Sequence, residues 1–219
     1  MNTPRIAVTG IGLVSPLGQD KHQAWRRLMD GEGGIEALGG EGHQPTIPAA
    51  RLGDFQASRW LNKLQMVGTE RVSQMALGAA RLAMDDAGLG AAFGDPERAG
   101  LYLGTGMGGA ATVDAGYAAL HAGRHLPPLT VPTGMVNNAA AIVAMHAHVG
   151  GPVLTFSVAC ASSAIAIAEA AHALRRGEID VALAGGSEAL LVRGSIAAWR
   201  ALHTLAPLHA SDVRDSCRP

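Results

Sequence analysis

Apolar residues occur along this chain in several short, unbroken runs that are bounded by glycine, proline or polar residues. Uninterrupted runs of roughly four to eight apolar residues between turn signals are typical of buried strands. The runs predict strands over residues 6–10, 99–104, 152–158 and 179–184.

Longer stretches repeat apolar residues three and four positions apart, which is the period of a helix with one buried face. The clearest one covers Glu70–Ala87, with Thr69 as its expected N-cap and Gly88 as its end. Further helices are predicted over 20–29, 113–121, 134–149, 161–176 and 195–202, with irregular connections over 31–54, 126–132 and 206–219.

The composition indicates a globular protein. Of the 219 residues 48% are hydrophobic, and the net charge is −1, so the sequence offers neither the low hydrophobicity of a disordered chain nor a basic surface for nucleic acid. Alanine and glycine are abundant and aromatic residues make up only 4%. This favours helices that pack closely on a sheet.

Two cysteines cannot form a disulfide framework, which suits a reducing cytoplasm. Residues 1–5 lead directly into the first predicted strand, so we expect no signal peptide. The stretch 125–168 has no charged residue, but its prolines and glycines divide it into pieces too short to cross ~30 Å of hydrocarbon. We therefore expect this stretch to be core and not a membrane span.

Cys160 lies between the strand predicted over 152–158 and the helix predicted over 161–176, which Gly177 ends. The free amide groups and the positive dipole end of a helix start favour a thiolate, which is the nucleophilic form. Small neighbours, among them Ser162, leave room for a substrate. A free cysteine is also commonly a small buried hydrophobe, and position alone leaves both interpretations open.

Four segments, taken together, resemble β-ketoacyl-acyl-carrier-protein synthases of the KAS I/KAS II type, a branch of the thiolase superfamily. They are RIAVTGIGLVSPLG (Arg5–Gly18), GTGMGG (Gly104–Gly109), ACAS (Ala159–Ser162) and GGSE (Gly185–Glu188). They occur in family order and span nearly the whole chain.

The resemblance implies a thiolase-like α/β fold, with a mixed, mostly parallel sheet covered by helices on both faces, over residues 1–219. It implies decarboxylative Claisen condensation with no organic cofactor or metal. Cys160 would accept the acyl group from an acyl carrier protein, and malonyl carrier protein would then lose carbon dioxide and attack that thioester. One oxyanion donor would be the Cys160 amide.

The resemblance also assigns substrate-binding residues and partners. Met107 and Gly108 would form part of the wall of the acyl channel, and Ser162 would lie beside the nucleophile. Met135 and Asn138 would lie at a dimer interface near the partner's acyl pocket. The strand over 152–159 would pair antiparallel with its own copy, which predicts a homodimer.

The family's second half carries two catalytic histidines, a lysine and a glycine-rich segment of the oxyanion hole, and none of them has a match here. The sequence thus resembles the N-terminal half alone. Such a half would expose the apolar surface of the helix that follows Cys160, so we expect it to be poorly stable or to associate. A non-catalytic half or a dimerisation partner without turnover is the alternative function.

Three other sequence patterns, for a dinucleotide site, a hydrolase site and a metal site, are incomplete. Gly10 and Gly12 begin a dinucleotide pattern, but Ser15 occupies the third glycine position. Ser187 has a hydrolase-like context that lacks the final glycine. The histidine pairs 121/125 and 146/148 have no further ligands nearby in sequence, so no metal site is predicted. Glu188 is expected to be a structural carboxylate that is buried and hydrogen-bonded to backbone or to a neighbouring loop.

Overall fold

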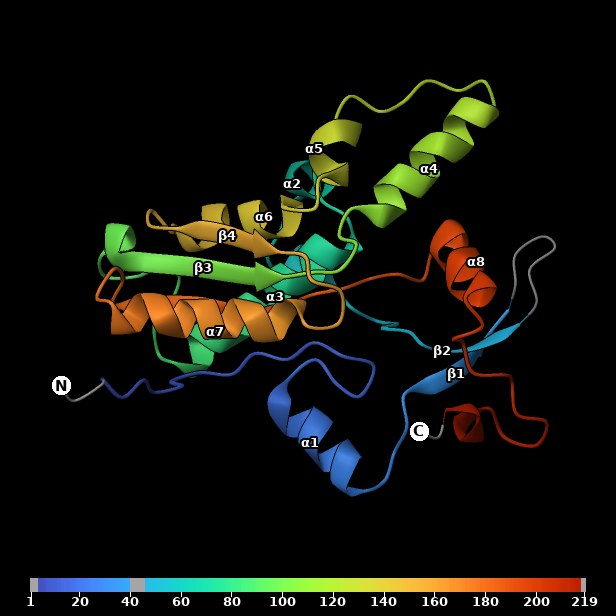
Figure 1. The fold of residues 1–219 in the computed structure, drawn as a ribbon, viewed down its shortest axis with the longest axis horizontal. Helices are drawn as coiled ribbons and strands as arrows, with labels where there is room; N and C mark the ends of the chain where they lie inside the picture. The colour runs from blue at the N-terminus through green and yellow to red at the C-terminus, as the bar shows by residue number, and fades with distance from the viewer. Residues whose placement is uncertain (1–3, 40–45, 218–219) are drawn as a thin grey trace. The chain divides into compact units, whose positions relative to one another are not determined.

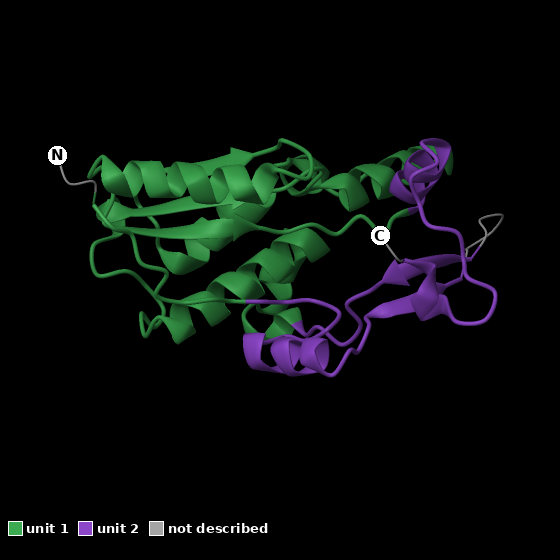
Figure 2. Cartoon of the chain, turned by 60° about the horizontal axis from the view of Figure 1, so that its bottom comes forward, with its two compact units in different colours: residues 1–12, 57–192 green, residues 13–56, 193–219 purple. Residues whose placement is uncertain are grey.

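The computed structural model describes residues 4–39 and 46–217, and the chain divides into two compact units (Figure 2). The first unit comprises the residues up to Gly12 together with Ala57–Val192, and the second comprises Leu13–Gln56 together with Arg193–Pro219. All the candidate site residues belong to the first unit.

The first unit is built on a parallel sheet in the order β4-β3-β5 (Figure 1). Its strands are β3 (Ala99–Gly104), β4 (Val153–Phe156) and β5 (Val181–Gly186). β3 lies in the centre, pairing Leu101 with Val153 on one side and with Leu183 on the other. All six residues of β3 are buried, which fits the unbroken apolar run that predicted it.

Helices cover both faces of this sheet, as the resemblance implies. α7 (Ser162–Arg175) packs on one face, and α6 (Asn138–Ala147), which packs in turn on α3 (Arg71–Asp86), lies on the other (Figure 1). The unit also contains three shorter or peripheral helices and two 3-10 turns among its described residues: α2 (Lys63–Val67), α4 (Ala110–His121), α5 (Thr130–Gly134), η1 (Ala57–Arg59) and η2 (Pro96–Arg98).

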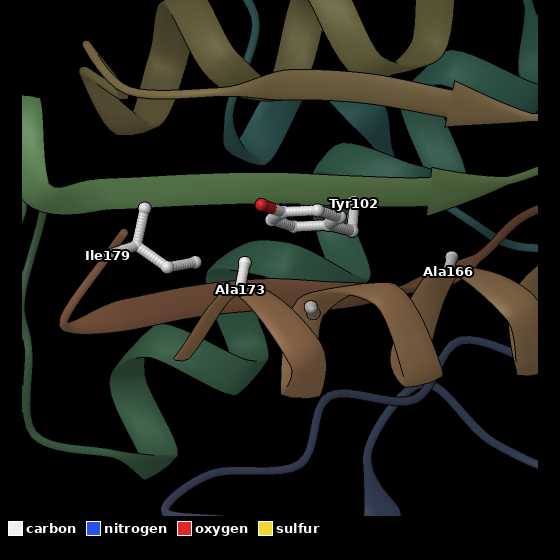
Figure 3. Close-up of a cluster of buried hydrophobic side chains, with 5 residues drawn as sticks. Tyr102, Ala166, Ala173 and Ile179 are labelled. Carbon is white, nitrogen blue, oxygen red and sulfur yellow. The ribbon is translucent and has the colours of Figure 1, made fainter. Parts of the chain in front are cut away.

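Alanines on α7 allow it to approach the sheet closely. Ala166, Ala170 and Ala173 are buried at helical spacing and pack with Tyr102 and Ile179 (Figure 3). The Tyr102 ring fills the space that the small alanine side chains leave between α7 and β3. Alternate residues of the same strands face the other way, where Ala99 packs with Met84 of α3 and Ala147 of α6.

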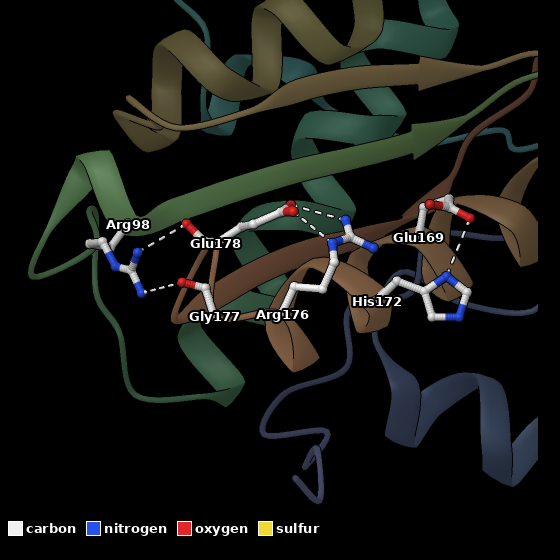
Figure 4. A network of polar contacts seen from close by, with 6 residues as sticks. All are labelled: Arg98, Glu169, His172, Arg176, Gly177 and Glu178. Atoms are coloured by element: carbon white, nitrogen blue, oxygen red, sulfur yellow. Dashed lines mark hydrogen bonds and ion pairs between the residues drawn. The ribbon is translucent and has the colours of Figure 1, made fainter. Parts of the chain in front are cut away.

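An arginine secures the connection between α7 and β5 at the amino ends of the strands. The Arg98 guanidinium donates to the carbonyl oxygens of Gly177 (2.9 Å) and Glu178 (3.1 Å) (Figure 4). It also pairs with the Asp180 carboxylate. Gly177 has φ +70° and ends α7, as the sequence predicted. The hydrogen bond from Arg98 lowers the pKa of Asp180.

The second unit contains α1 (Lys21–Met29), α8 (Arg193–Ala201), η3 (Val213–Ser216) and an antiparallel hairpin of β1 (Ile35–Leu38) with β2 (Ile47–Ala50). Asp20 caps α1 by accepting from the His22 and Gln23 amides at 2.9 and 2.8 Å. The helix predicted over 20–29 is therefore confirmed, whereas the irregular connection predicted over 31–54 is wrong where the hairpin forms.

Several other predictions need correction. Residues 6–10 form no strand, and Val8 is 82% exposed. The loop predicted over 126–132 contains the start of α5, and the helix predicted from residue 134 begins only at Asn138. Thr69 does not cap α3: Glu70 occupies the N-cap position and makes no side-chain capping bond.

Candidate active site

The candidate site residues follow the carboxyl ends of the three parallel strands. β3 runs into the loop Gly104–Gly109, β4 runs into the turn that carries Cys160, and β5 is followed directly by Ser187 and Glu188. Because the strands are parallel and adjacent, these three segments emerge at one edge of the sheet. That edge is where ligands commonly bind in open α/β sheets.

Glycines allow these segments to approach one another without side chains between them. A Cβ on Gly104 would lie 2.5 Å from the Ser162 carbonyl oxygen and closer still to the next peptide atoms of α7. A Cβ on Gly186 would lie 2.7 Å from the Ser163 Cβ and 2.8 Å from the Gly104 carbonyl oxygen. The start of α7 therefore rests directly on the backbone ends of β3 and β5.

Cys160 lies in a tight turn immediately before α7. The Ala161 amide donates to the Val158 carbonyl at 3.1 Å, and the Ser162 amide donates to the Ala159 carbonyl at 3.2 Å. Ala159 has φ +49°, a left-handed conformation that is uncommon for a residue with a side chain. The Cys160 side chain is exposed, so the alternative of a buried structural cysteine does not hold in this chain.

Ser162 holds this turn through its side chain. Its hydroxyl accepts from the Val158 amide at 2.8 Å and donates to the Ala159 carbonyl at 2.7 Å, and the residue is only 3% exposed. Ser162 was predicted to bind substrate. In the structure its hydroxyl instead forms hydrogen bonds with the backbone of the two residues that precede Cys160.

Met107 and Gly108 occupy the middle of the glycine-rich loop. Met107 is 46% exposed, whereas Gly108 is buried, and a Cβ there would lie 3.0 Å from the Thr105 hydroxyl and 3.3 Å from the Val136 carbonyl. Ser157 joins this loop to the Cys160 turn, because its hydroxyl donates to the Gly106 carbonyl at 3.0 Å. The structure thus brings the loop and the cysteine turn into direct contact.

The segment that includes Met135 lies against the same loop. A Cβ on Gly109 would collide with the Gly134 carbonyl, so only glycine permits this approach, and Gly109 also has φ +86°. Met135 is 50% exposed. Asn138 is 9% exposed, accepts from the Ser73 hydroxyl at 2.6 Å and donates to the Pro132 carbonyl at 3.0 Å. Asn138 is therefore occupied in linking α3, α5 and α6.

Two carboxylates hold the loop. Glu188 accepts from the Gly106 and Met107 amides at 2.8 and 2.9 Å. The structural role predicted for Glu188 agrees with these bonds, but the residue is exposed and not buried. Glu70 accepts from the Gly109 amide at 2.9 Å and from the Thr112 amide at 2.8 Å.

The contribution of Glu70 was missed from the sequence. Glu70 and Thr112 are 42 positions apart, and no local spacing rule connects them. No feature of the sequence signals this role, because the helix predicted over 70–87 takes Thr69 as its N-cap and the missing cap bond of Glu70 is seen only in the structure.

The remaining motifs form no second site. The Ser187 hydroxyl donates to the Val72 carbonyl at 2.9 Å, so it is engaged in a structural contact between β5 and α3. Among residues 4–39 and 46–217, no group of three or more histidine, cysteine or acidic side chains is placed to hold a metal ion. Within the same residues, no helix has the length and apolar character needed to cross a membrane.

The parallel sheet, with a helix that begins beside an exposed cysteine, defines a thiolase-like α/β domain. A solved structure described as the ishigamide ketosynthase/chain length factor superposes with a TM-score of 0.81 at 25% sequence identity. The superposition covers 91% of this chain and 51% of that one.

The family follows from the sequence comparison. The profile described as "Beta-ketoacyl synthase, N-terminal domain" matches residues 3–217, and the chain belongs to this family. It is 34% identical over 218 residues to Nodulation protein E of Rhizobium sp. (strain N33), covering 98% of this chain and 52% of that protein. It is 31% identical over 211 residues to 3-oxoacyl-[acyl-carrier-protein] synthase 2 of Coxiella burnetii (strain RSA 493 / Nine Mile phase I), covering 93% and 51%.

The chain spans about half the length of these curated relatives. The resemblance read from the four sequence segments is therefore confirmed at the level of the family, its N-terminal part and the thiolase-like fold.

Proposed function

We propose that this chain is the nucleophile-bearing part of a β-ketoacyl-acyl-carrier-protein synthase and that Cys160 is its catalytic residue. The observation that carries the proposal is the exposed thiol, held in a strained turn beside the start of α7. Family membership supports it. We further propose that residues 1–219 act as one ketosynthase domain.

In the proposed reaction the Cys160 thiolate attacks an acyl thioester, forming a new carbon–sulfur bond and releasing the carrier thiol. Malonyl carrier protein then loses carbon dioxide, and the resulting carbanion attacks the Cys160 thioester. A carbon–carbon bond forms, the bond to Cys160 breaks, and a β-ketoacyl chain two carbons longer leaves on the carrier. The decarboxylation histidines and the second oxyanion donor would come from the part of the family fold that this chain does not span.

The residues around the thiol have separate roles in this proposal. Met107 and Gly108 form a wall for the acyl chain, supported by the contact between their loop and the Cys160 turn. Met135 would contact the substrate from the segment that packs against that loop. Ser162 and Asn138 act by fixing backbone, since their polar atoms bond within the fold.

The proposed partners are an acyl carrier protein and a second copy of the chain. The carrier protein is supported by the name of the Coxiella relative. The homodimer is supported by the sheet order, in which β4 has a paired neighbour on one side only among the described strands. Val153 and Leu154 on this strand are 39% and 45% exposed. We propose that the reaction takes place in the cytoplasm, in keeping with two cysteines that are both free.

The experiment is incubation of the chain with an acyl-carrier-protein thioester, followed by intact-mass measurement and assay of condensation with malonyl carrier protein. The proposal predicts one acyl adduct, which Cys160→Ala abolishes. An adduct without condensation product is expected of this chain when it is tested alone. Absence of an adduct from the wild-type chain would contradict the proposal and favour the non-catalytic alternative. Labelling of Ser187 by a fluorophosphonate would instead favour a hydrolase.

A further inference from the structure

Glu188 is exposed, yet its carboxylate accepts several hydrogen bonds from the glycine-rich loop. One carboxylate oxygen, Oε2, accepts from the Gly106 amide, the Met107 amide and, at 3.4 Å, the Thr105 hydroxyl. The other oxygen accepts from the Ala189 amide at 3.1 Å. Two successive backbone amides that point at one anion form a concave binding arrangement, and here a side chain of the same fold occupies it.

The chain places this carboxylate by extending β5 beyond its last residue. The Ser187 amide donates to the Gly104 carbonyl at 3.1 Å, which continues the parallel pairing with β3 by one step. The Ser187 hydroxyl donates to the Val72 carbonyl of α3. Ser187, the residue before Glu188, is therefore bonded both to β3 and to α3. These two bonds fix the position of Glu188 relative to the loop.

Gly106 connects Glu188 to the cysteine turn. Its amide donates to Glu188, and its carbonyl accepts from the Ser157 hydroxyl, three residues before Cys160. A Cβ on Gly106 would lie 3.1 Å from the Glu188 oxygen and 4.0 Å from the Ala159 carbonyl. The absence of a side chain on Gly106 therefore allows both the Glu188 carboxylate and the Cys160 turn to lie close to its backbone.

We propose that Glu188 is a positioning residue for acyl transfer to Cys160: its carboxylate fixes the amides of Gly106 and Met107, and Gly106 in turn fixes the turn that carries the thiol. This inference rests on the proposed function. Glu188 does not touch the reacting atoms in this account. It acts by restricting a loop that, with glycine at four of its six positions, would otherwise have wide backbone freedom.

The charge of the side chain matters for this role. A carboxylate accepts hydrogen bonds about twice as strongly as a neutral oxygen, and Glu188 accepts two from the loop backbone. Loss of the carboxylate leaves Met107, the proposed wall of the acyl channel, without this anchor. An acyl chain that must lie along that wall would then be misplaced, whereas a small reagent that needs only the thiol would be unaffected.

The test compares two reactions of Cys160 in the full chain: acylation by an octanoyl thioester of pantetheine and alkylation by iodoacetamide. Glu188→Ala removes both charge-assisted hydrogen bonds to the loop amides. It is expected to slow acylation by at least about tenfold, the effect of losing one such bond, with alkylation within about twofold of wild type. Glu188→Gln keeps an acceptor oxygen but loses the charge, so it is expected to recover only part of the acylation rate.

Glu178→Ala is the matched control. Glu178 is a carboxylate of the same unit that lies just before β5, and its side chain bonds Arg176 (Figure 4). It is half exposed, as its side-chain exposure is 49%. Its removal is expected to leave both reactions unchanged.

Acylation of Glu188→Ala at the wild-type rate would overturn the inference. So would an equal loss of both reactions together with a lower melting temperature, because that pattern marks a general loss of fold.

Amide hydrogen exchange separates this inference from the proposed function. If wild-type Cys160 accepts no acyl group, the proposed function fails. Exchange in the peptide spanning 105–109 then still decides the role of Glu188. Faster exchange there in Glu188→Ala, but not in Glu178→Ala, supports its hold on the loop, and unchanged exchange refutes it.

Discussion

Gly104→Ala tests whether the candidate site is assembled by direct contact between backbones. The added Cβ would lie 2.5 Å from the Ser162 carbonyl oxygen, about 1 Å inside ordinary contact. The neighbour is helix backbone and cannot rotate away as a side chain could. Overpacking of this kind costs about 1–3 kcal/mol, and we expect the upper end, about 3 kcal/mol, because the start of α7 must move.

The control is Gly185→Ala in the adjacent strand. A Cβ at Gly185 would meet nothing within 4 Å, so this variant changes the same residue type in the same sheet without a collision. Removing the excess conformational freedom of glycine should leave it neutral or slightly more stable than wild type.

Thermal and urea denaturation followed by circular dichroism measure the difference. A loss of about 3 kcal/mol corresponds to a fall in melting temperature of about 6–12 °C for a chain of this size. Gly104→Ala should also slow acylation of Cys160, because the shifted helix carries the Cys160 turn with it. Equal stability of the two variants would show that the start of α7 does not rest on Gly104, and so would a Gly104→Ala variant within about 0.5 kcal/mol of wild type.

Three further predictions concern single side chains. Ser162→Ala removes the buried hydroxyl that links two backbone groups of the Cys160 turn, and urea denaturation should show a loss of about 1–2 kcal/mol; an unchanged midpoint would contradict this. Glu70→Ala frees two backbone amides at the start of α4, so hydrogen exchange there should accelerate while α7 stays protected. The hydrogen bond from Arg214 lowers the pKa of Asp212 to about 2. This ion pair therefore contributes stability above the ordinary value of 3.8 that is lost as the pH falls through about 2. Arg214→Ala should return the carboxyl titration measured by NMR towards 3.8, and an unmoved titration would disprove the pairing.

The sequence predicted best those elements whose signal is local. The strand over 99–104 was placed with its observed bounds, and the helix after Cys160 was placed within one residue at each end. Its end was marked by Gly177, which adopts the left-handed conformation that glycine favours. Alternation of such strands and helices, together with the family motifs, was enough for the fold class.

The first predicted strand shows why an apolar pattern is insufficient by itself. Residues 6–10 have the composition of a strand, but a strand also needs a neighbour that supplies backbone hydrogen bonds. Among the described residues none pairs with them. The segment instead passes α3, where the Ile11 amide donates to Asp86 at 2.9 Å.

The hairpin of β1 and β2 was missed because its strands have a pairing neighbour but only a weak local pattern. Its strands are four residues each and lie in a stretch rich in glycine and proline, so a short window holds little periodic signal. The pairing, such as Ile35 with Ala50, supplies what the local pattern lacks.

Burial around the candidate site was also overestimated from the sequence. The absence of charge over 125–168 predicted a deep core, and α6 agrees, with seven of its ten residues buried. The segment after β4 does not: Val158 is 51% exposed. On α7, Ile165 and Ile167 are 39% and 53% exposed, which agrees with the apolar helix surface expected of this part of the family fold.

Selectivity between the two exposed thiols shows whether Cys160 is the nucleophile. Cys160 and Cys217 are both exposed, but only Cys160 is held in the turn that the glycine-rich loop contacts. The measurement is peptide mass mapping after brief incubation with an acyl-carrier-protein thioester, with iodoacetamide labelling as the reference for simple accessibility. We expect the acyl group on the Cys160 peptide, while iodoacetamide labels both cysteines. Acylation of both thiols in proportion to their iodoacetamide labelling, or of neither, would contradict this expectation.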